Sequence, residues 1–476
     1  METAQPAVDR SESDWALTRS VHARLSAADV EFRELVRREP VGTVEDEGEG
    51  AHGARAMMAF TPQPWPLFLS RRCVGELAAA SVAVSVLLRS LPERLFGNDP
   101  DRLAVCFGVE ATSLRLGLRP PNGIAEALTR GDFLFGPDGF RCVELNIASN
   151  LGGWENRLLA EVALATPRIR DFVRRLGRAV TFRDPFRQLI LHIVHGVRTA
   201  GLAADGEVNL ALTIRDPMTH RVERLAAHLK AEYAAALATL SPAASGQLWL
   251  CHPDALAMRY GALYHGGTRV HAVDDHQFDR VEPVLFRCFK AGTLRLYNAP
   301  ILMLLSDKRT LALLSEHAES DAFTAEERRT IERHVPWTRR LLPGPVTWEG
   351  EREELGRLVL ARREEMVLKL GRSMGGRHVL LGRETAAAEW ESAIRQALAA
   401  GDWIVQRVVP SFPLLCHGGQ SGAGAHDAVW GPFVFGSHYA GMNLRVQPQG
   451  RSGVVNVATR DATLAAIFEV DDRPPA

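Results

Sequence analysis

The residues best suited to chemistry in this sequence lie around a predicted hairpin between Arg130 and Asn146. Asp132 begins its first strand, and Glu144 and Asn146 stand two residues apart in the second. Side chains alternate between the faces of a strand, so Glu144 and Asn146 share a face that Asp132 can join from the partner strand. Two carboxylates and an amide oxygen suit Mg²⁺, and Arg130, on the face of Asp132, can neutralise developing negative charge. The alternative is a solvent-exposed hairpin face with one salt bridge.

A second group of residues suits contact with phosphate. Lys369 lies on a predicted strand that runs into a turn containing Gly375 and Gly376. Glycines let backbone amides approach phosphate oxygens, and the lysine supplies positive charge. Lys308 begins a predicted helix, where it can also meet a phosphate. The pattern is neither a Walker motif nor GxGxxG, and the alternatives are a plain turn and a solvated helix face.

Three further segments carry polar side chains in suggestive places. Gln406 lies in a strand-like run whose backbone can present donors and acceptors to an adenine ring, although such a run is more often core. Arg445 and Asn456 lie in a late predicted hairpin and offer an arginine and an amide to an anion. His192 and His195 could chelate a metal from one helix face, but the HExxH pattern is absent and we do not expect a metal there.

Lysine is scarce in this chain. Only four of its 56 basic residues are lysines, namely Lys230, Lys290, Lys308 and Lys369, and the others are arginines. A compact ammonium on a flexible stem contacts phosphate as a point charge, whereas a guanidinium needs more room. Each remaining lysine therefore marks a position where arginine does not serve, unless it is a leftover on the surface.

The elements that position these residues follow from the hydrophobic pattern. Two strands joined by a Pro-Asp-Gly turn form the hairpin. Alternating strands and helices predict a small parallel αβ layer over residues 200 to 298. The other predicted elements are a helical leader at 15–38, a mobile loop at 42–55, helix at 64–95, a buried strand at 103–108, helix at 156–200, helix at 255–260, helix at 301–337 and helix at 386–399.

Composition narrows the class of protein. A length of 476 residues predicts about three domains, and 46% hydrophobic with 24% charged residues is ordinary for a globular chain. Lys and Arg total 56 against 57 for Asp and Glu, so no global positive field favours nucleic acid or an anionic membrane. We expect a small-molecule partner.

Cysteine usage and apolar stretches point to the cytoplasm. The six cysteines are scattered without CxxC spacing, which fits neither a disulfide framework nor a zinc site. The first residues lack the apolar segment of a secretory signal. The longest apolar stretch, 73–88, contains Glu76 and is shorter than the roughly 20 residues that cross a bilayer, so it predicts a buried helix.

Taken in order, these segments resemble the circularly permuted ATP-grasp enzymes related to glutathionylspermidine synthetase and, more distantly, eukaryotic glutathione synthetase. The resemblance spans roughly residues 100 to 460. The matching positions are Arg130 and Asp132, Val143 to Asn146, Gly152 and Gly153, Asn298 to Pro300, Ser306 to Lys308, Val335 to Thr338, Leu368 to Leu370, Gly375 and Gly376, Trp390, Trp403 to Gln406, Tyr439 to Gly441, and Arg445.

The resemblance implies an α+β fold, a circularly permuted ATP-grasp with an interposed parallel αβ layer. It implies a leader and mobile loop at 1–60, an N-terminal region with the metal-binding hairpin at 61–199, a substrate-side αβ domain at 200–298, and the ATP-binding part at 299–476. In this family pattern Asp132, Glu144 and Asn146 hold Mg²⁺. Arg130 and Arg445 act in catalysis, while Lys308, Lys369, Gly375, Gly376 and Gln406 bind ATP.

The implied reaction joins a carboxylate to an amine. The acid attacks the γ-phosphate of ATP to give an acyl phosphate, and the amine then displaces phosphate to form an amide, releasing ADP and phosphate. The substrates would be small molecules or short peptides. The chain lacks the amidase domain of the bifunctional enzymes, and Gln406 with Arg407 replaces a more acidic hinge, so glutathione and spermidine are not assumed. The alternatives are a catalytically silent ATP-binding module and a small-molecule kinase.

Overall fold

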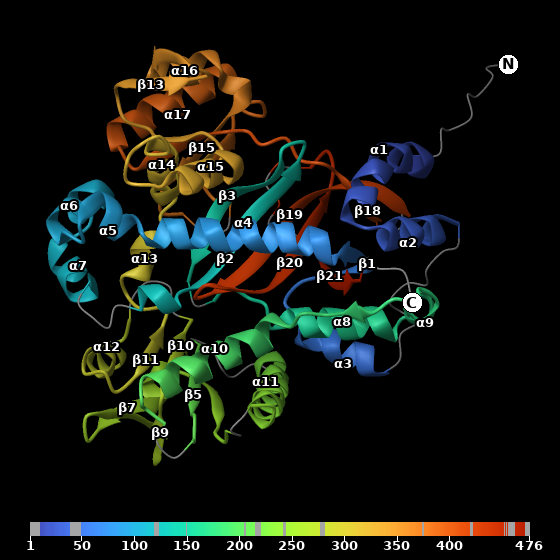
Figure 1. Cartoon of the computed structure of the whole chain (residues 1–476), viewed down its shortest axis with the longest axis vertical. Coiled ribbons are helices and arrows are strands. Elements are labelled where there is room, and N and C mark those ends of the chain that lie inside the picture. The colour runs from blue at the N-terminus through green and yellow to red at the C-terminus, as the bar shows by residue number, and fades with distance from the viewer. Residues whose placement is uncertain are drawn as a thin grey trace.

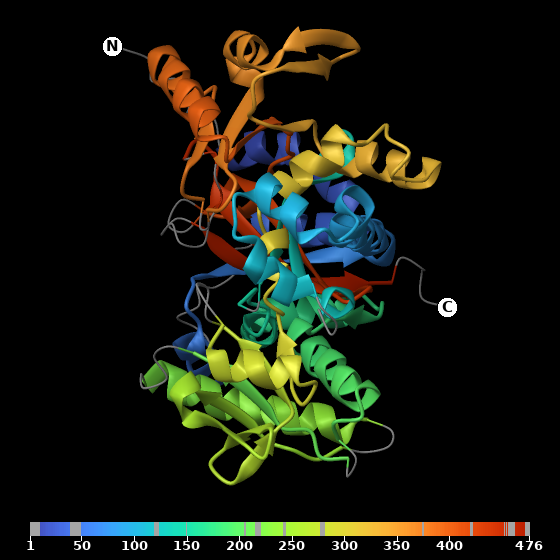
Figure 2. The ribbon, with the colours of Figure 1, turned by 90° about the vertical axis from the view of Figure 1, so that its left-hand side faces the viewer.

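The computed structural model describes a long molecule built in three tiers around a central sheet (Figures 1 and 2). A small α+β tier, residues 301 to 407, lies at one end, and a tier containing a parallel sheet lies at the other. The described residues are 10–38, 49–118, 123–148, 150–203, 206–214, 220–240, 244–276, 281–373, 376–418, 422–451, 453, 455 and 462–471.

The central sheet joins strands from both ends of the chain. Its main path runs β1-β21-β20-β19-β2-β3, with β18 added to β19 and β4 added to β21. The pair β1 and β21 is parallel, and the other pairs are antiparallel. The strands are β1 (Pro62–Ser70), β2 (Leu128–Gly136), β3 (Gly139–Ile147), β4 (Val180–Thr181), β18 (Leu414–His417), β19 (Ala423–Phe435), β20 (His438–Pro448) and β21 (Thr463–Val470).

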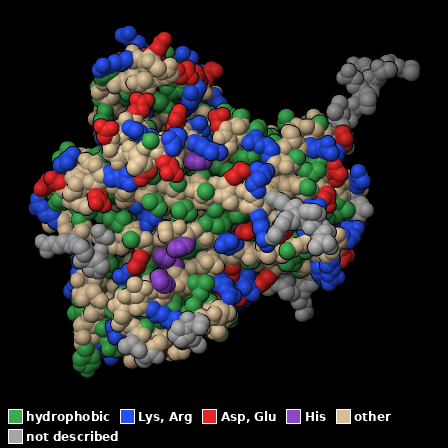
Figure 3. Space-filling model, viewed as in Figure 1, with side chains coloured by type: hydrophobic (Ala, Val, Ile, Leu, Met, Phe, Trp, Pro, Cys, Tyr) green, Lys and Arg blue, Asp and Glu red, His purple; other side chains and the backbone are tan. Residues whose placement is uncertain are grey.

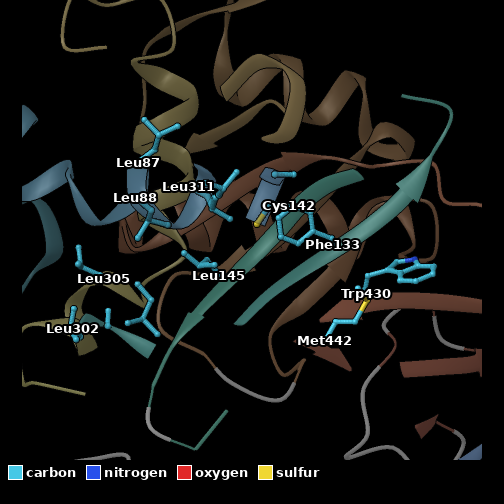
Figure 4. Close-up of a cluster of buried hydrophobic side chains, with 14 of the residues drawn as sticks. Leu87, Leu88, Phe133, Cys142, Leu145, Leu302, Leu305, Leu311, Trp430 and Met442 are labelled. Carbon is cyan, nitrogen blue, oxygen red and sulfur yellow. The ribbon is translucent and has the colours of Figure 1, made fainter. Parts of the chain in front are cut away.

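One long apolar helix covers a face of this sheet. Helix α4 (Arg71–Arg89) crosses it in Figure 1, and Leu87 and Leu88 pack in the same core as Phe133 and Leu145 of the hairpin (Figure 4). Full burial of such side chains is worth about 1.5–3 kcal/mol each. Because neighbouring residues of a strand face opposite ways, this packing turns Asp132 and Glu144 toward the other face.

The apolar composition of α4 follows from this packing. Among the described residues one helical stretch, Arg71–Phe96, is long and apolar enough to cross a membrane by length and composition, and 56% of its most apolar window is buried within the molecule. The other helices around the central sheet are α1 (Arg10–Leu25), α2 (Ala27–Arg38), α3 (Glu49–Met57), α5 (Leu91–Phe96), α6 (Pro100–Phe107), α7 (Ala111–Leu118), α8 (Glu155–Ala165) and α9 (Pro167–Arg175).

The second tier contains a four-stranded parallel sheet, β11-β10-β5-β6, within the segment expected to form a parallel layer. A three-stranded antiparallel sheet, β7-β8-β9, adjoins it. The elements are α10 (Pro185–Thr199), β5 (Leu210–Thr213), α11 (His220–Ala238), β6 (Leu248–Cys251), β7 (Leu256–Arg259), β8 (Ala262–His265), β9 (Thr268–Val270), β10 (Ala272–Asp275), α12 (Pro283–Lys290) and β11 (Arg295–Tyr297).

The third tier holds another four-stranded sheet, β12-β17-β15-β16, which is antiparallel, and a β13-β14 hairpin. Its elements are α13 (Leu302–Leu305), α14 (Arg309–Glu316), α15 (Ala325–His334), β12 (Thr338–Arg340), β13 (Pro345–Trp348), β14 (Glu351–Glu354), α16 (Leu355–Ala361), β15 (Met366–Leu370), β16 (Val379–Leu381), α17 (Ala387–Ala400) and β17 (Trp403–Arg407).

Several local predictions were wrong. Of the segment 103–108, expected as a strand, residues 103–107 belong to helix α6. The helix forms because Asp99 caps the backbone N–H groups of Asp101 and Arg102 and Pro100 starts it. The segment 64–95 begins with strand β1 rather than helix, because residues 62–70 pair with the distant β21.

Two further corrections concern short segments. Residues 256–259, within the expected helix 255–260, form strand β7, because they pair with β8. The expected loop at 42–55 ends in helix α3, and residues 42–48 of that loop lie outside the described residues. Strand β4 interrupts the expected helix 156–200. No disulfide joins the six cysteines, all of which lie among the described residues.

Candidate active site

The hairpin β2-β3 brings four of the predicted residues together. Arg130 is the cross-strand neighbour of Asn146, and Asp132 is the neighbour of Glu144. All four side chains line one cavity of about 380 Å³. A β-bulge follows Asp132, and it leaves Val143 without a partner in the β2-β3 ladder.

Asp132 is surrounded by cationic groups. Its Oδ1 lies 2.6 Å from Arg445 Nη2 and 3.5 Å from Arg130 Nε, and Asn146 donates to it through Nδ2 at 3.4 Å. Burial alone would raise the pKa of Asp132, but the two guanidinium groups outweigh it and lower that pKa below its ordinary value. Asp132 is therefore a carboxylate at neutral pH.

The two phosphate-directed lysines meet the hairpin from the third tier. Lys308 is the residue before α14. Its Nζ lies 3.3 Å from Glu144 Oε1 and donates to the Ser373 carbonyl. Lys369 on β15 donates at 3.1 Å to the carbonyl of Val143, the residue that has no partner in the β2-β3 ladder. Both lysines are buried. Burial lowers the pKa of Lys369 to about 8, against the opposing effect of Glu144.

The side chain of Gln406 is hydrogen-bonded to two neighbouring side chains. It lies on β17, is 1% exposed, accepts from Lys369 Nζ at 2.7 Å and donates to Thr338 Oγ1 at 3.0 Å. Its side chain therefore orients Lys369, and the segment 407–409 directly after it lines the cavity. Gly376 lines the same cavity with a φ of 70°, and the predicted Gly375 lies outside the described residues, as does Asn456.

The loop between β15 and β16 is anchored to the start of α14. Lys308 N donates to the Gly371 carbonyl at 3.0 Å, in addition to the Nζ contact with Ser373. A Cβ on Gly371 would lie 2.7 Å from Asp307 Oδ1, so this close approach requires glycine. Two hydrogen bonds of Lys308, one from its backbone N and one from Nζ, thus hold the loop after β15 at the start of α14.

The cavity is lined by aliphatic as well as charged side chains. The central sheet supplies Leu134 and Val429, and the third tier supplies Val367 and Leu381. The visible surface in Figure 3 carries acidic and basic side chains interspersed rather than one dominant sign.

Among the polar residues of this cavity that sequence reasoning missed, two are buried. Glu155, the first residue of α8, is 2% exposed, and Asn443, two residues before Arg445 on β20, is 3% exposed with a buried Oδ1 that has no hydrogen-bond partner among the described residues. The alternation of faces along β20 could have indicated Asn443 once Arg445 was chosen. Glu155 comes two residues after Gly153, and the Gly152-Gly153 turn was noted without it.

The structure also shows what the other candidates do. His192 hydrogen-bonds the Glu126 carbonyl at 3.0 Å, and burial lowers its pKa to about 4. Among the described residues no group of three or more His, Cys, Asp and Glu is placed to hold a metal. A cation at Asp132 and Glu144 would thus depend on the Asn146 amide and on oxygens from a ligand or water.

Comparison with known proteins supports the fold. No family model matches the sequence, and no curated protein matches it. Among solved structures, a glutathione synthetase-like effector from Globodera pallida in its apo form matches with a TM-score of 0.53. The chain resembles a glutathione synthetase-like protein in fold. The match covers 89% of this chain and 96% of the effector at 11% sequence identity, so the likeness to this glutathione synthetase-like protein concerns the whole architecture.

The glutathione synthetase-like match agrees with the mixed α and β content and with an ATP-grasp-like fold. At this identity it shows the fold alone.

Proposed function

We propose that the protein is an ATP-dependent carboxylate–amine ligase of the circularly permuted ATP-grasp type. The observation that carries the proposal is the convergence of the hairpin carboxylates with two buried lysines from another tier, with Lys308 Nζ 3.3 Å from Glu144 Oε1. Glu144 and Lys369 line the cavity, and Lys308 adjoins it through its contact with Glu144. Paired opposite charges of this kind suit a polyanion together with its counter-cation, because each can displace one side of the ion pairs.

The residues present fit ATP and Mg²⁺. Asp132, Glu144 and Asn146 would hold Mg²⁺ through oxygen, and the metal would neutralise charge on the transferring phosphoryl group. Lys308 and Lys369 would contact the phosphates, with Gly376 in the covering loop. Gln406 holds the Lys369 ammonium in place, and the aliphatic side chains that line the cavity would contact the base.

Arg130 and Arg445 would act on the reacting groups. Both guanidinium groups lie at Asp132 and line the cavity, so they can neutralise charge on an acyl phosphate and on the departing phosphate. Small-molecule or short-peptide acids and amines are the proposed substrates. Circular permutation is supported by the order along the chain, since the proposed metal-binding hairpin precedes the lysines and β17.

The test is a screen for activated acids. The protein is incubated with Mg-ATP, hydroxylamine and a panel of amino acids and short peptides, and both ADP and hydroxamate are measured. An acyl phosphate predicts equal amounts of the two. AMP with pyrophosphate would contradict the proposal, a stable phosphorylated product would indicate a kinase, and ATP-dependent thermal stabilisation without turnover would indicate a silent binding module.

The substitution Glu144→Gln tests the proposed metal site. We expect kcat to fall about 10²- to 10³-fold, the size seen when one preorganised electrostatic contact is removed, and the concentration of Mg²⁺ needed for half-maximal rate to rise. Glu364→Gln, which changes an exposed glutamate in the third tier, is the matched control. A Glu144→Gln protein with unchanged rate and Mg²⁺ requirement would remove this residue from the site.

A further inference from the structure

The carboxyl group of Glu155 is not used by the proposed reaction, although it lies in the same cavity. It is the first side chain of α8 and follows the Gly152-Gly153 turn. Only 2% of the residue is exposed. A carboxyl group at such depth loses most of its hydration, so it needs either a partner or a proton.

The contacts of Glu155 leave much of its acceptor capacity open. Its Oε2 accepts a hydrogen bond from Gly153 N at 2.9 Å. Asp132 and Glu144 each have a cationic side chain within 3.5 Å, whereas no lysine, arginine or histidine among the described residues lies within ion-pair distance of Glu155. Burial raises the pKa of Glu155, and backbone N–H groups and Arg130 oppose this.

The turn before Glu155 places it at the reacting end of the cavity. Arg130 Nη1 donates to the Leu151 carbonyl at 2.6 Å, so the turn wraps around the arginine proposed to act on the acyl phosphate. Arg130 on β2 is the charged side chain whose electrostatic field lowers the pKa of Glu155. The same guanidinium also interacts electrostatically with Asp132, Glu144 and Arg445. The apolar Phe60 and Leu464 also line the cavity, and the Phe60 ring lies 6.4 Å from that of Trp154, the residue before Glu155.

We propose that Glu155 is the general base that receives a proton from a primary alkylammonium acceptor. This inference rests on the proposed ligase function. The ammonium gives one proton to the Glu155 carboxylate, and the resulting amine attacks the acyl carbon. The new C–N bond forms as the C–O bond to phosphate breaks, and the second proton leaves with the phosphate, so charge and protons balance.

Hydroxylamine and alkylamines separate this role from a structural one. Hydroxylamine is largely unprotonated at neutral pH and needs no base, whereas glycine, lysine and spermidine arrive as ammonium ions. A glutamine at position 155 can still accept the hydrogen bond from Gly153 N but cannot take a proton. We therefore expect Glu155→Gln to form hydroxamate at the wild-type rate and to form amides about 10²-fold or more slowly at pH 7.

The controls cover folding and burial. Asp184→Asn changes another buried carboxyl group, which caps α10 through Phe186 N and Arg187 N and does not line the cavity; asparagine caps equally well, and both rates should stay unchanged. Glu155→Asp should recover part of the amide rate. Thermal melting with and without Mg-ATP checks that each variant is folded.

Each outcome decides one proposal. Hydroxamate formation by both proteins, with amide formation lost in Glu155→Gln, supports the base. Equal amide rates and equal pH profiles in the two proteins overturn the role of Glu155 as base and leave the ligase proposal standing. Hydroxamate formation by the wild type, with no amide from any of the three amines, has the same two consequences. An absence of hydroxamate in the wild type contradicts the ligase function itself.

Discussion

At the scale of single residues, the site is a set of ion pairs with both partners buried or half-buried. Lys308 and Lys369 approach Glu144 and the bulge carbonyl of Val143, while Arg130 and Arg445 meet Asp132. Desolvation of such groups is costly unless they are paired, so each cation keeps the carboxylates charged. In such a site a bound anion or cation can replace one partner of each ion pair, whereas apolar side chains in the same positions would contribute more to stability.

The lowered pKa of Lys369 predicts that ATP binding depends on pH. In the free protein the lysine loses its proton as the pH rises through about 8. Phosphate favours the charged lysine, so binding above pH 8 must take up a proton, and affinity should fall up to about tenfold per pH unit. Calorimetry at pH 7 and 9, in buffers of different ionisation enthalpy, measures both effects.

Two lysine variants check this assignment. Lys369→Met should bind Mg-ATP more weakly at pH 7 and lose the proton uptake at pH 9. Lys290→Met, which changes the lysine over the Phe286 ring in the second tier, should behave as the wild type. Undiminished proton uptake in Lys369→Met would assign the titration to another group.

At the scale of elements, α4 is fixed to the central sheet by a buried arginine as well as by its apolar face. Arg89 is 7% exposed and donates to the carbonyls of Ile124, Ala125 and Gly436. Burial lowers its pKa to about 10, which leaves it charged at neutral pH. The arginine thus joins the end of α4 to the start of β2 and to the turn between β19 and β20.

Arg89→Met should destabilise the protein strongly. The substitution leaves the carbonyls of Ala125 and Gly436 without their donor, while Ile124 keeps Ala127 N. Each buried unsatisfied group costs about 1–3 kcal/mol, so we expect a loss of about 2 kcal/mol or more in the free energy of unfolding by urea. Arg72→Met, on the exposed side of the same helix, removes one pair with Glu76 and should cost less than about 0.5 kcal/mol. Similar losses in both variants would refute the bridging role of Arg89.

At the scale of the whole molecule, one side chain fastens the parallel tier to the central sheet. Asn298 follows β11, and it accepts from Leu128 N and donates to the Leu128 carbonyl at the first residue of β2. It therefore pairs with the backbone in the manner of a neighbouring strand. The hairpin that carries Arg130 and Asp132 begins at this junction.

Asn298→Ala should loosen the junction without unfolding either sheet. Both Leu128 groups would lose their partner, at about 1–3 kcal/mol each. Hydrogen exchange followed by mass spectrometry should show faster exchange at 128–130 and 295–297, with exchange unchanged in the third tier at 366–370. Faster exchange throughout the molecule would mean that Asn298 supports global stability rather than this contact.

The proposed site could be predicted from sequence as far as its residues lie within one hairpin. Asp132, Glu144 and Asn146 are brought together by a turn and by strand alternation, which are local signals. The approach of Lys308 and Arg445 depends on contacts between distant segments, and only the family resemblance suggested it. Glu155 was missed because an acidic residue in the first turn of a helix is already accounted for by the helix dipole.

The errors in the fold have the same origin. Strand β1 was predicted as helix because its partner β21 lies about 400 residues further along the chain, as the contact of Gln63 with Thr463 shows. Helix α6 was predicted as a strand because its apolar run was short, although the cap at Asp99 was present in the sequence. Capping residues thus decided an element that hydrophobicity alone left ambiguous.

The pairing of β1 with β21 has a consequence for biosynthesis. A ribosome delivers residues 62–70 long before residues 463–470 exist, so an apolar strand must wait for its partner while the residues between the two strands are made. Exposed strands of this kind invite aggregation, and the nascent protein is expected to need a chaperone until residues 463–470 have been made. The proposed site would be completed in the same period of synthesis, since Arg445 on β20 pairs with Leu464 on β21.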